Sequence, residues 1–118
     1  MILDGQKIKG AILAALADPE MVSILDYAMY QSKSVNDIIR ETSIPHTTAY
    51  RKIKWLLDEK LLVVDKISIS ADGKKYSLFQ SMFRSISVTY ESAKVTINVE
   101  RNIDPTTVLT ERFFSFKE

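Results

Sequence analysis

Residues 41–56 of this 118-residue chain read ETSIPHTTAYRKIKWL, and this stretch says most about the fold. Pro45 disfavours helical backbone at the residue before it, so a preceding helix has to end near Thr42. A second helix can begin at Pro45 itself, because the fixed φ of proline suits the first helical turn. We expect this helix to span residues 45–59. Its inward-facing apolar residues recur at helical spacing and are Ala49, Ile53 and Leu56.

The segment just upstream predicts a short helix. Ser34 can accept a hydrogen bond from the backbone as N-cap, and Asp37 three residues later completes an imperfect capping box. Val35, Ile38 and Ile39 then supply the apolar positions of a helix that ends around Thr42. A short helix, a tight break and a longer helix have the spacing of a helix-turn-helix.

Two further helices are expected before it. The first runs from Gln6 to Ala17, and the second begins at Asp18-Pro19-Glu20 and continues to about Gln31. Asp18 is a suitable N-cap, and Pro19 suits a first helical position that needs no N–H donor. The expected inward residues are Ile8, Ile12, Ala15 and Leu16 on the first helix and Val22, Leu25, Ala28 and Met29 on the second.

After Leu61 the apolar residues alternate, as they do in strands. Asp72-Gly73 lies between alternating runs and predicts a hairpin turn, since glycine accepts the positive φ that such a turn needs. A second hairpin is expected from strands near residues 86–90 and 95–99, and a helix with an apolar face after Asp104. The predicted fold class is therefore α+β.

The stretch 41–56, followed by Leu61-Leu62 and a hairpin, resembles the winged helix-turn-helix of archaeal ArsR-like transcriptional regulators. The resemblance covers roughly residues 18–81 and implies a DNA-binding protein whose wing surrounds Asp72-Gly73. Ser43 and Lys60 stand where such proteins often carry glycine. Metal-sensing members use cysteine or several histidines, whereas this chain has no cysteine and one histidine, so the metal-sensor role is not carried over.

The chain is expected to form one compact unit with two functional parts. Residues 1–81 form the winged helix-turn-helix DNA-binding domain, and residues 82–118 add the second hairpin and the tail as a dimerisation element. The apolar first helix and the phenylalanine-rich tail exceed what a small winged domain needs for its own core, and such surfaces mark interfaces. We therefore expect a homodimer; the alternative is that both segments fold back on the same monomer.

The candidate DNA-binding residues lie on the helix 45–59 and on the wing 66–76. The first half of that helix contains basic residues and no acid, and an arginine there can bond guanine in the major groove. Lysines at the wing tip can neutralise backbone phosphates. The candidates are His46, Thr47, Thr48, Tyr50, Arg51, Lys52, Lys54, Lys66, Lys74 and Lys75.

Composition excludes several other classes. The absence of cysteine excludes disulfides, a thiol nucleophile and zinc thiolates, and a single histidine excludes a multi-histidine metal centre. No catalytic constellation or phosphate-binding glycine loop is present, so we expect no enzyme, no cofactor and no metal. The longest apolar run, residues 11–17, is too short to span a membrane. A cytoplasmic protein is the expectation.

These observations predict a sequence-specific regulator of transcription that binds double-stranded DNA as a homodimer. The alternative is a winged-helix adaptor that binds another protein and no DNA, because a fold alone does not settle function. The net charge of only +1 keeps this alternative open. The acid-free face from Pro45 to Lys54 favours DNA.

Overall fold

The computed structural model describes residues 1–102, and the helix expected after Asp104 lies outside these residues. Four helices and five strands occupy the described part of the chain. In order they are β1 (Ile2–Leu3), α1 (Gln6–Leu16), α2 (Pro19–Tyr27), α3 (Val35–Thr42), α4 (His46–Asp58), β2 (Leu62–Ile69), β3 (Lys75–Ser81), β4 (Phe83–Glu91) and β5 (Lys94–Arg101).

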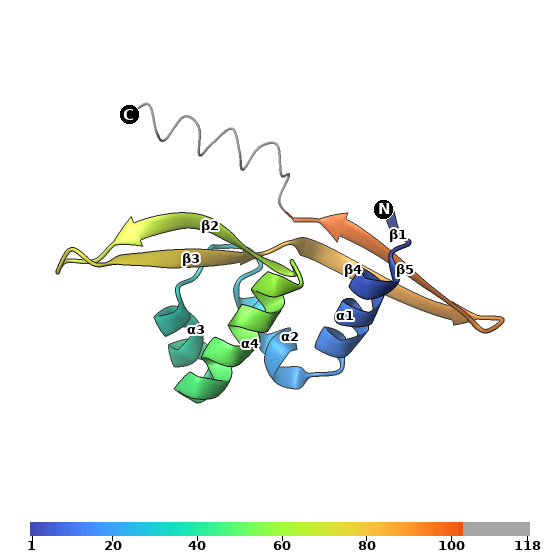
Figure 1. Ribbon diagram of the computed structural model, residues 1–118, viewed down its shortest axis with the longest axis horizontal. Coiled ribbons are helices and arrows are strands. Elements are labelled where there is room, and N and C mark those ends of the chain that lie inside the picture. The colour runs from blue at the N-terminus through green and yellow to red at the C-terminus, as the bar shows by residue number, and fades with distance from the viewer. Residues whose placement is uncertain (103–118) are drawn as a thin grey trace, which may run out of the picture.

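The helices lie together on one side of a long ribbon that the two hairpins form (Figure 1). The β2–β3 hairpin extends from one end of the helical cluster and the β4–β5 hairpin from the other, which makes the molecule elongated, at 56 × 35 × 20 Å. The α+β class, the helix-turn-helix and the hairpin that follows it are confirmed. The two hairpins thus leave the helices free to present a surface of their own.

The helix-turn-helix has the local structure that its sequence predicts. Ser34 and Asp37 form a capping box at the start of α3, with the Asp37 amide donating to the Ser34 hydroxyl over 3.1 Å. Ser43 ends α3 in the left-handed conformation, at φ 59°. Ile44 then enters the core, and α4 begins directly after Pro45. The break between the helices is therefore set by a left-handed residue, a buried anchor and a proline.

One hydrophobic core joins the helices to both hairpins. Ile38 from α3 and the predicted stripe of α4 are buried, as are Phe79 from β3 and Ile97 from β5. The fully buried large residues come from α1, α2, α3, α4 and the strand region, and they are Ile12, Ile24, Ile38, Leu56, Leu61, Leu62, Ile97 and Val99. The orientation of α4 is thus fixed by packing along its whole inner face.

The inward faces predicted for the first two helices are partly wrong. On α2 the buried residues are Met21 and Ile24, whereas Val22 is 40% exposed and Leu25 is half-buried. Just beyond the helix, Ala28 is buried as predicted and Met29 is half-buried. Leu16, at the end of α1, is 41% exposed. The sequence of α2 carries two adjacent apolar stripes, and periodicity alone does not say which one the rest of the fold covers. The helix is also shorter than expected, since it ends at Tyr27 rather than near Gln31.

The β2–β3 hairpin is the predicted wing. Gly73 adopts φ 84° in its turn, which explains why glycine is needed there. A bulge after Val64 shifts the register, so that Lys66 lies opposite Leu78. The backbone of Lys33, just before α3, bonds to that of Phe79 at 2.8 and 2.7 Å. This short bridge ties the base of the wing to the helix-turn-helix.

The second sheet includes a strand that the sequence did not indicate. β4 and β5 form the predicted hairpin, and β1 pairs antiparallel with β5 to give the order β1–β5–β4. Two residues are too few to show strand alternation, so β1 could not be recognised in the sequence. Its pairing places the N-terminus in the same sheet as the C-terminal hairpin.

The conformation of Lys60 gives a first testable prediction. Lys60 follows α4 at φ 64°, in the left-handed region that costs a non-glycine residue about 1–2 kcal/mol. Lys60→Gly removes this cost but adds backbone entropy to the unfolded chain, so we expect stability to rise by about 0.5–1 kcal/mol in urea unfolding. Ala14→Gly inside α1 is the matched control and should lower stability by about 1 kcal/mol. A drop in stability on Lys60→Gly would contradict this interpretation.

Candidate nucleic-acid interface

The first three turns of α4 present a polar and basic face to solvent. His46, Thr47, Arg51 and Lys54 are exposed, and the Tyr50 side chain is 55% exposed. Thr48 is half-buried. The inner stripe fixes the helix by packing, so these outward side chains are held on a rigid element rather than on a loop.

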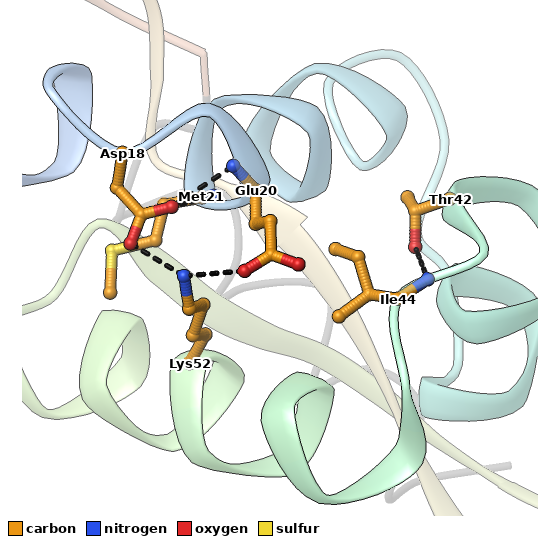
Figure 2. A network of polar contacts seen from close by, with 6 residues as sticks. All are labelled: Asp18, Glu20, Met21, Thr42, Ile44 and Lys52. Atoms are coloured by element: carbon orange, nitrogen blue, oxygen red, sulfur yellow. Dashed lines mark hydrogen bonds and ion pairs between the residues drawn. The ribbon is translucent and has the colours of Figure 1, made fainter.

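Lys52, which the sequence groups with the candidate DNA contacts, does not lie on this exposed face. Its side chain is only 9% exposed, and its ammonium lies 2.6 Å from Asp18 Oδ2 and 2.7 Å from Glu20 Oε1 (Figure 2). Asp18 simultaneously caps α2, accepting bonds from the amides of Glu20 and Met21 at 2.9 and 3.1 Å. Lys52 therefore links α4 to the start of α2.

A signal for this role is present in the sequence. Lys52 lies three residues after Ala49 and four before Leu56, so helical spacing places it on the inward stripe itself. A lysine on an apolar stripe needs an anionic partner. The start of α2 offers two carboxylates, of which one was predicted only as an N-cap. What the sequence does not give is the pairing of α4 with α2.

The Lys52 link shifts the ionisation of both partners. The hydrogen bond from Lys52 holds the pKa of Asp18 below its usual range, outweighing partial burial, and the Met21 amide adds to the effect. The bonds to Asp18 and Glu20 in turn raise the pKa of Lys52. Both groups are therefore held in their charged forms at neutral pH.

These shifts predict a decrease in stability in acid. A carboxyl whose pKa is lower in the folded state stabilises the protein above its unfolded pKa of about 4, and this contribution disappears as pH falls through the folded value. We expect the urea midpoint to fall as pH is lowered from about 6 to 3 and Asp18→Asn, which retains a capping side chain, to weaken that dependence. Identical pH profiles for the two proteins would argue against the assigned role of Asp18.

Carboxylates near the exposed face of α4 are engaged with basic residues. Lys54 lies 3.4 Å from Asp58, but both side chains are well exposed, and such a pair contributes little free energy. On α3, Asp37 bonds to Arg40 at 2.7 Å in addition to its place in the capping box. No ion pair involves Arg51 within residues 1–102. Arg51 is thus the arginine of α4 that is free to meet an anionic partner.

The wing tip lies near the same face. Tyr50 from α4 and both tip lysines, Lys74 and Lys75, line one open hollow of about 630 Å³, whose lining includes the start of α3. Lys74 lies 4.0 Å from Asp72, a long distance for an ion pair, and both are exposed. Lys66 is exposed too but does not line the hollow. The fold therefore brings Lys74 and Lys75 together with Tyr50, while Lys66 stays further from the tip.

Two other kinds of feature, a metal site and a membrane-spanning helix, are not found in the described residues. Within residues 1–102, no three histidine, aspartate or glutamate side chains gather where they could hold a metal ion. In the same part of the chain, no helix is both long enough and apolar enough to cross a membrane.

Comparisons with known proteins give no family for this chain. No protein-family model and no curated protein sequence matches it. Two solved structures align along most of its length. NolR from Sinorhizobium fredii is 14% identical over 97% of this chain and 93% of NolR, with a TM-score of 0.44. HlyU from Vibrio cholerae N16961 is 13% identical over 92% of each chain, also with a TM-score of 0.44.

Proposed function

We propose that this chain is a sequence-specific regulator of transcription that binds double-stranded DNA as a homodimer, with α4 in the major groove. The observation that carries the proposal is the exposed face of the first part of α4, residues 46–54, which contains basic residues and no acidic one and includes Arg51. This face lies on the second helix of a helix-turn-helix, and the N-terminal part of that helix is the part that meets base edges in such proteins.

Each residue of this face has a chemistry suited to DNA. Arg51 can donate two hydrogen bonds to the O6 and N7 atoms of guanine, and a threonine methyl such as that of Thr47 can contact the thymine methyl. Tyr50, His46 and Lys54 can donate to phosphate oxygens, which fixes position without reading sequence. Lys52 is not included, because its charge is already satisfied by α2.

The β2–β3 hairpin supplies the second contact in this proposal. Lys74 and Lys75 lie at its tip and share a hollow with Tyr50, so they can reach the DNA backbone or minor groove beside α4. Lys66 is assigned a weaker contribution, since it lies back from the tip. The wing thus provides affinity that does not depend on sequence.

Two copies of the chain would place two such helices about one duplex turn apart. Apolar side chains suited to a contact between copies are exposed on the outer part of the β4–β5 hairpin, where Val88 is 42% and Tyr90 75% exposed. These residues belong to the segment 82–118 that the sequence assigns to dimerisation. Sedimentation of wild type and of a Val88→Ser/Tyr90→Ser variant tests this part of the proposal, which predicts that only the variant is monomeric.

The wing contact predicts a change in salt dependence. Each phosphate that the protein no longer neutralises should reduce the slope of log K against log[salt] by about 0.9 for duplex DNA. We expect Lys74→Ala/Lys75→Ala to weaken binding to all duplexes alike and to reduce the slope by up to about 2. The measurement is fluorescence anisotropy at several salt concentrations. An unchanged slope would remove the wing from the interface.

Sequence preference is tested by selecting bound duplexes from a random pool. The proposal predicts that wild type enriches a common motif and that Arg51→Ala enriches a more degenerate one. If a folded wild-type protein binds DNA but enriches no motif, its binding is non-specific, and the sequence-specific part of the proposal is wrong.

A further inference from the structure

An apolar groove lies on the part of the molecule that the proposed DNA contact does not use. The second apolar stripe of α2, Val22 and Leu25, forms one wall together with Met29, two residues beyond the helix, and Leu16 closes the groove at the end of α1. Phe83 and Ile86 of β4 form the opposite wall. The space is about 220 Å³, below the roughly 300–1,000 Å³ typical of small-molecule sites, so it suits a few side chains better than a ligand.

The groove lies beside β4, which is an edge strand of the three-stranded sheet. Ile97 and Val99 of β5 are fully buried, whereas Ile86 of the edge strand β4 is only half-buried. The Val22 and Leu16 side chains on the facing helices are both about 40% exposed. Adjoining exposed apolar residues of this kind mark a surface that something else covers.

Residue 102, the last that the structure describes, lies at the rim of the groove. The Asn102 amide donates to the Met82 carbonyl at 2.8 Å, and its side-chain nitrogen donates to the carbonyls of Met29 and Ser81 at 2.6 and 3.0 Å. Met29 itself lines the groove, and Phe83 pairs with Arg101. Asn102 is therefore fixed beside both walls, and whatever follows it starts from that point.

The composition of the segment that follows matches the groove. Residues 103–118 read IDPTTVLTERFFSFKE and carry five large apolar side chains beyond the first residue, which are Val108, Leu109, Phe113, Phe114 and Phe116. Extended backbone covers about 3.3–3.6 Å per residue, so the six residues from Asn102 to Val108 can reach about 20 Å. That reach allows the apolar residues to enter the groove from its rim.

We propose that residues 103–118 occupy this groove on the chain to which they belong. The tether at Asn102 lies at the rim of the chain's own groove and gives the segment an effective concentration in the millimolar range, as for a short linker, which exceeds that of a separate chain at micromolar concentration. Burial of the phenylalanines would cover the second stripe of α2 and the exposed side of β4. Segment 103–118 is then a part of the monomer's own core, and contact between copies falls to other surfaces such as Val88 and Tyr90.

The absence of cysteine allows a direct test in the full-length chain. Val22→Cys places a single thiol on the groove wall, and its rate of reaction with a maleimide reports whether the wall is covered. The same substitution is made in a chain carrying Phe113→Ser, Phe114→Ser and Phe116→Ser. Ser87→Cys, on the polar face of β4, is the matched control, and Leu16→Cys repeats the measurement on another wall.

We expect the thiol at position 22 to react at least about tenfold more slowly beside the native tail than beside the serine tail, while the control at position 87 reacts equally in both. Equal rates at positions 22 and 16 in the two tail backgrounds would overturn the proposal.

A mixing experiment separates the same chain from a second copy. The Val22→Cys chain with the serine tail is refolded from urea together with an excess of the cysteine-free wild-type chain. The proposal predicts that the thiol at position 22 still reacts rapidly with the maleimide, because the native tail of the wild-type chain binds only the groove of its own chain. Renewed protection would show that the segment crosses to a second copy and would overturn the proposal. Neither result depends on DNA, so a failure here leaves the proposed function untouched.

Discussion

Replacing Arg51 with alanine is expected to weaken binding to a preferred duplex by about 5- to 150-fold and to relax sequence preference at one position. The physical reason is the removal of a bidentate bond to guanine, which is worth about 1–3 kcal/mol against the wrong base. Arg51 is exposed on α4 and has no ion pair within residues 1–102, so its removal should leave the fold intact. The measurement is a competition titration against a set of single-base variants of the duplex.

The matched control for this experiment is Arg84→Ala. Arg84 is also an exposed arginine, but it lies on β4 and bonds to Glu100 at 2.9 Å, away from α4. Its removal takes the same charge from the protein, so it corrects for the general effect of net charge on DNA affinity. Equally weakened binding in the two variants would mean that charge, rather than the face of α4, is responsible.

Replacing Lys52 with methionine is expected to lower the free energy of unfolding by about 2 kcal/mol. Methionine keeps the length and packing of the side chain but leaves Asp18 and Glu20 without their partner. Removing one member of a fully buried pair costs about 3–5 kcal/mol, and the smaller value here reflects the 26% and 43% exposure of the two carboxylates. Urea unfolding at neutral pH is the measurement.

Lys54→Met is the control on the same helix. Its ion pair with Asp58 joins two exposed side chains, and such pairs are worth about 0.3–0.5 kcal/mol. The two variants remove the same charge from the same helix and differ in the burial of the ion pair. The two variants should also differ in DNA affinity: Lys54→Met should weaken binding more than Lys52→Met, since Lys54 belongs to the proposed interface and Lys52 does not. A destabilisation no larger for Lys52→Met than for Lys54→Met would contradict the structural role of Lys52.

Local chemistry made the helix-turn-helix predictable. Ser34, Asp37 and Pro45 each act on neighbouring backbone, so their effects are visible in the sequence without knowledge of distant contacts. The same holds for Gly73, which marks the wing turn. The exposed half of α4 also followed from its own periodicity, because Ala49, Ile53 and Leu56 define which side faces inward.

Features that depend on contacts between distant residues could not be predicted from the sequence in the same way. The choice between the two apolar stripes of α2 depends on which elements pack against it, and the strand β1 exists only through its pairing with β5. Lys52 follows Arg51 directly in the sequence, and the acidic partners that pair with it at the start of α2 are distant along the chain. The groove beside Met29 likewise appears only when α2 and β4 are brought together.

The alternative function is an adaptor that binds another protein through the same fold. The net charge of +1 is compatible with such a role, and a winged helix does not by itself require DNA. An adaptor has no need of a helix that carries basic residues and no acid from Pro45 to Lys54, with two wing lysines nearby. The two functions differ most clearly in how binding responds to salt.

The decisive experiment is fluorescence anisotropy of a labelled generic duplex, titrated with the protein at several salt concentrations. Arg51→Ala/Lys54→Ala serves as the control. A DNA-binding regulator should show micromolar affinity at low salt that weakens steeply as salt is added and collapses in the control. No binding at low salt by a folded wild-type protein would contradict the proposed function and point to a protein partner instead.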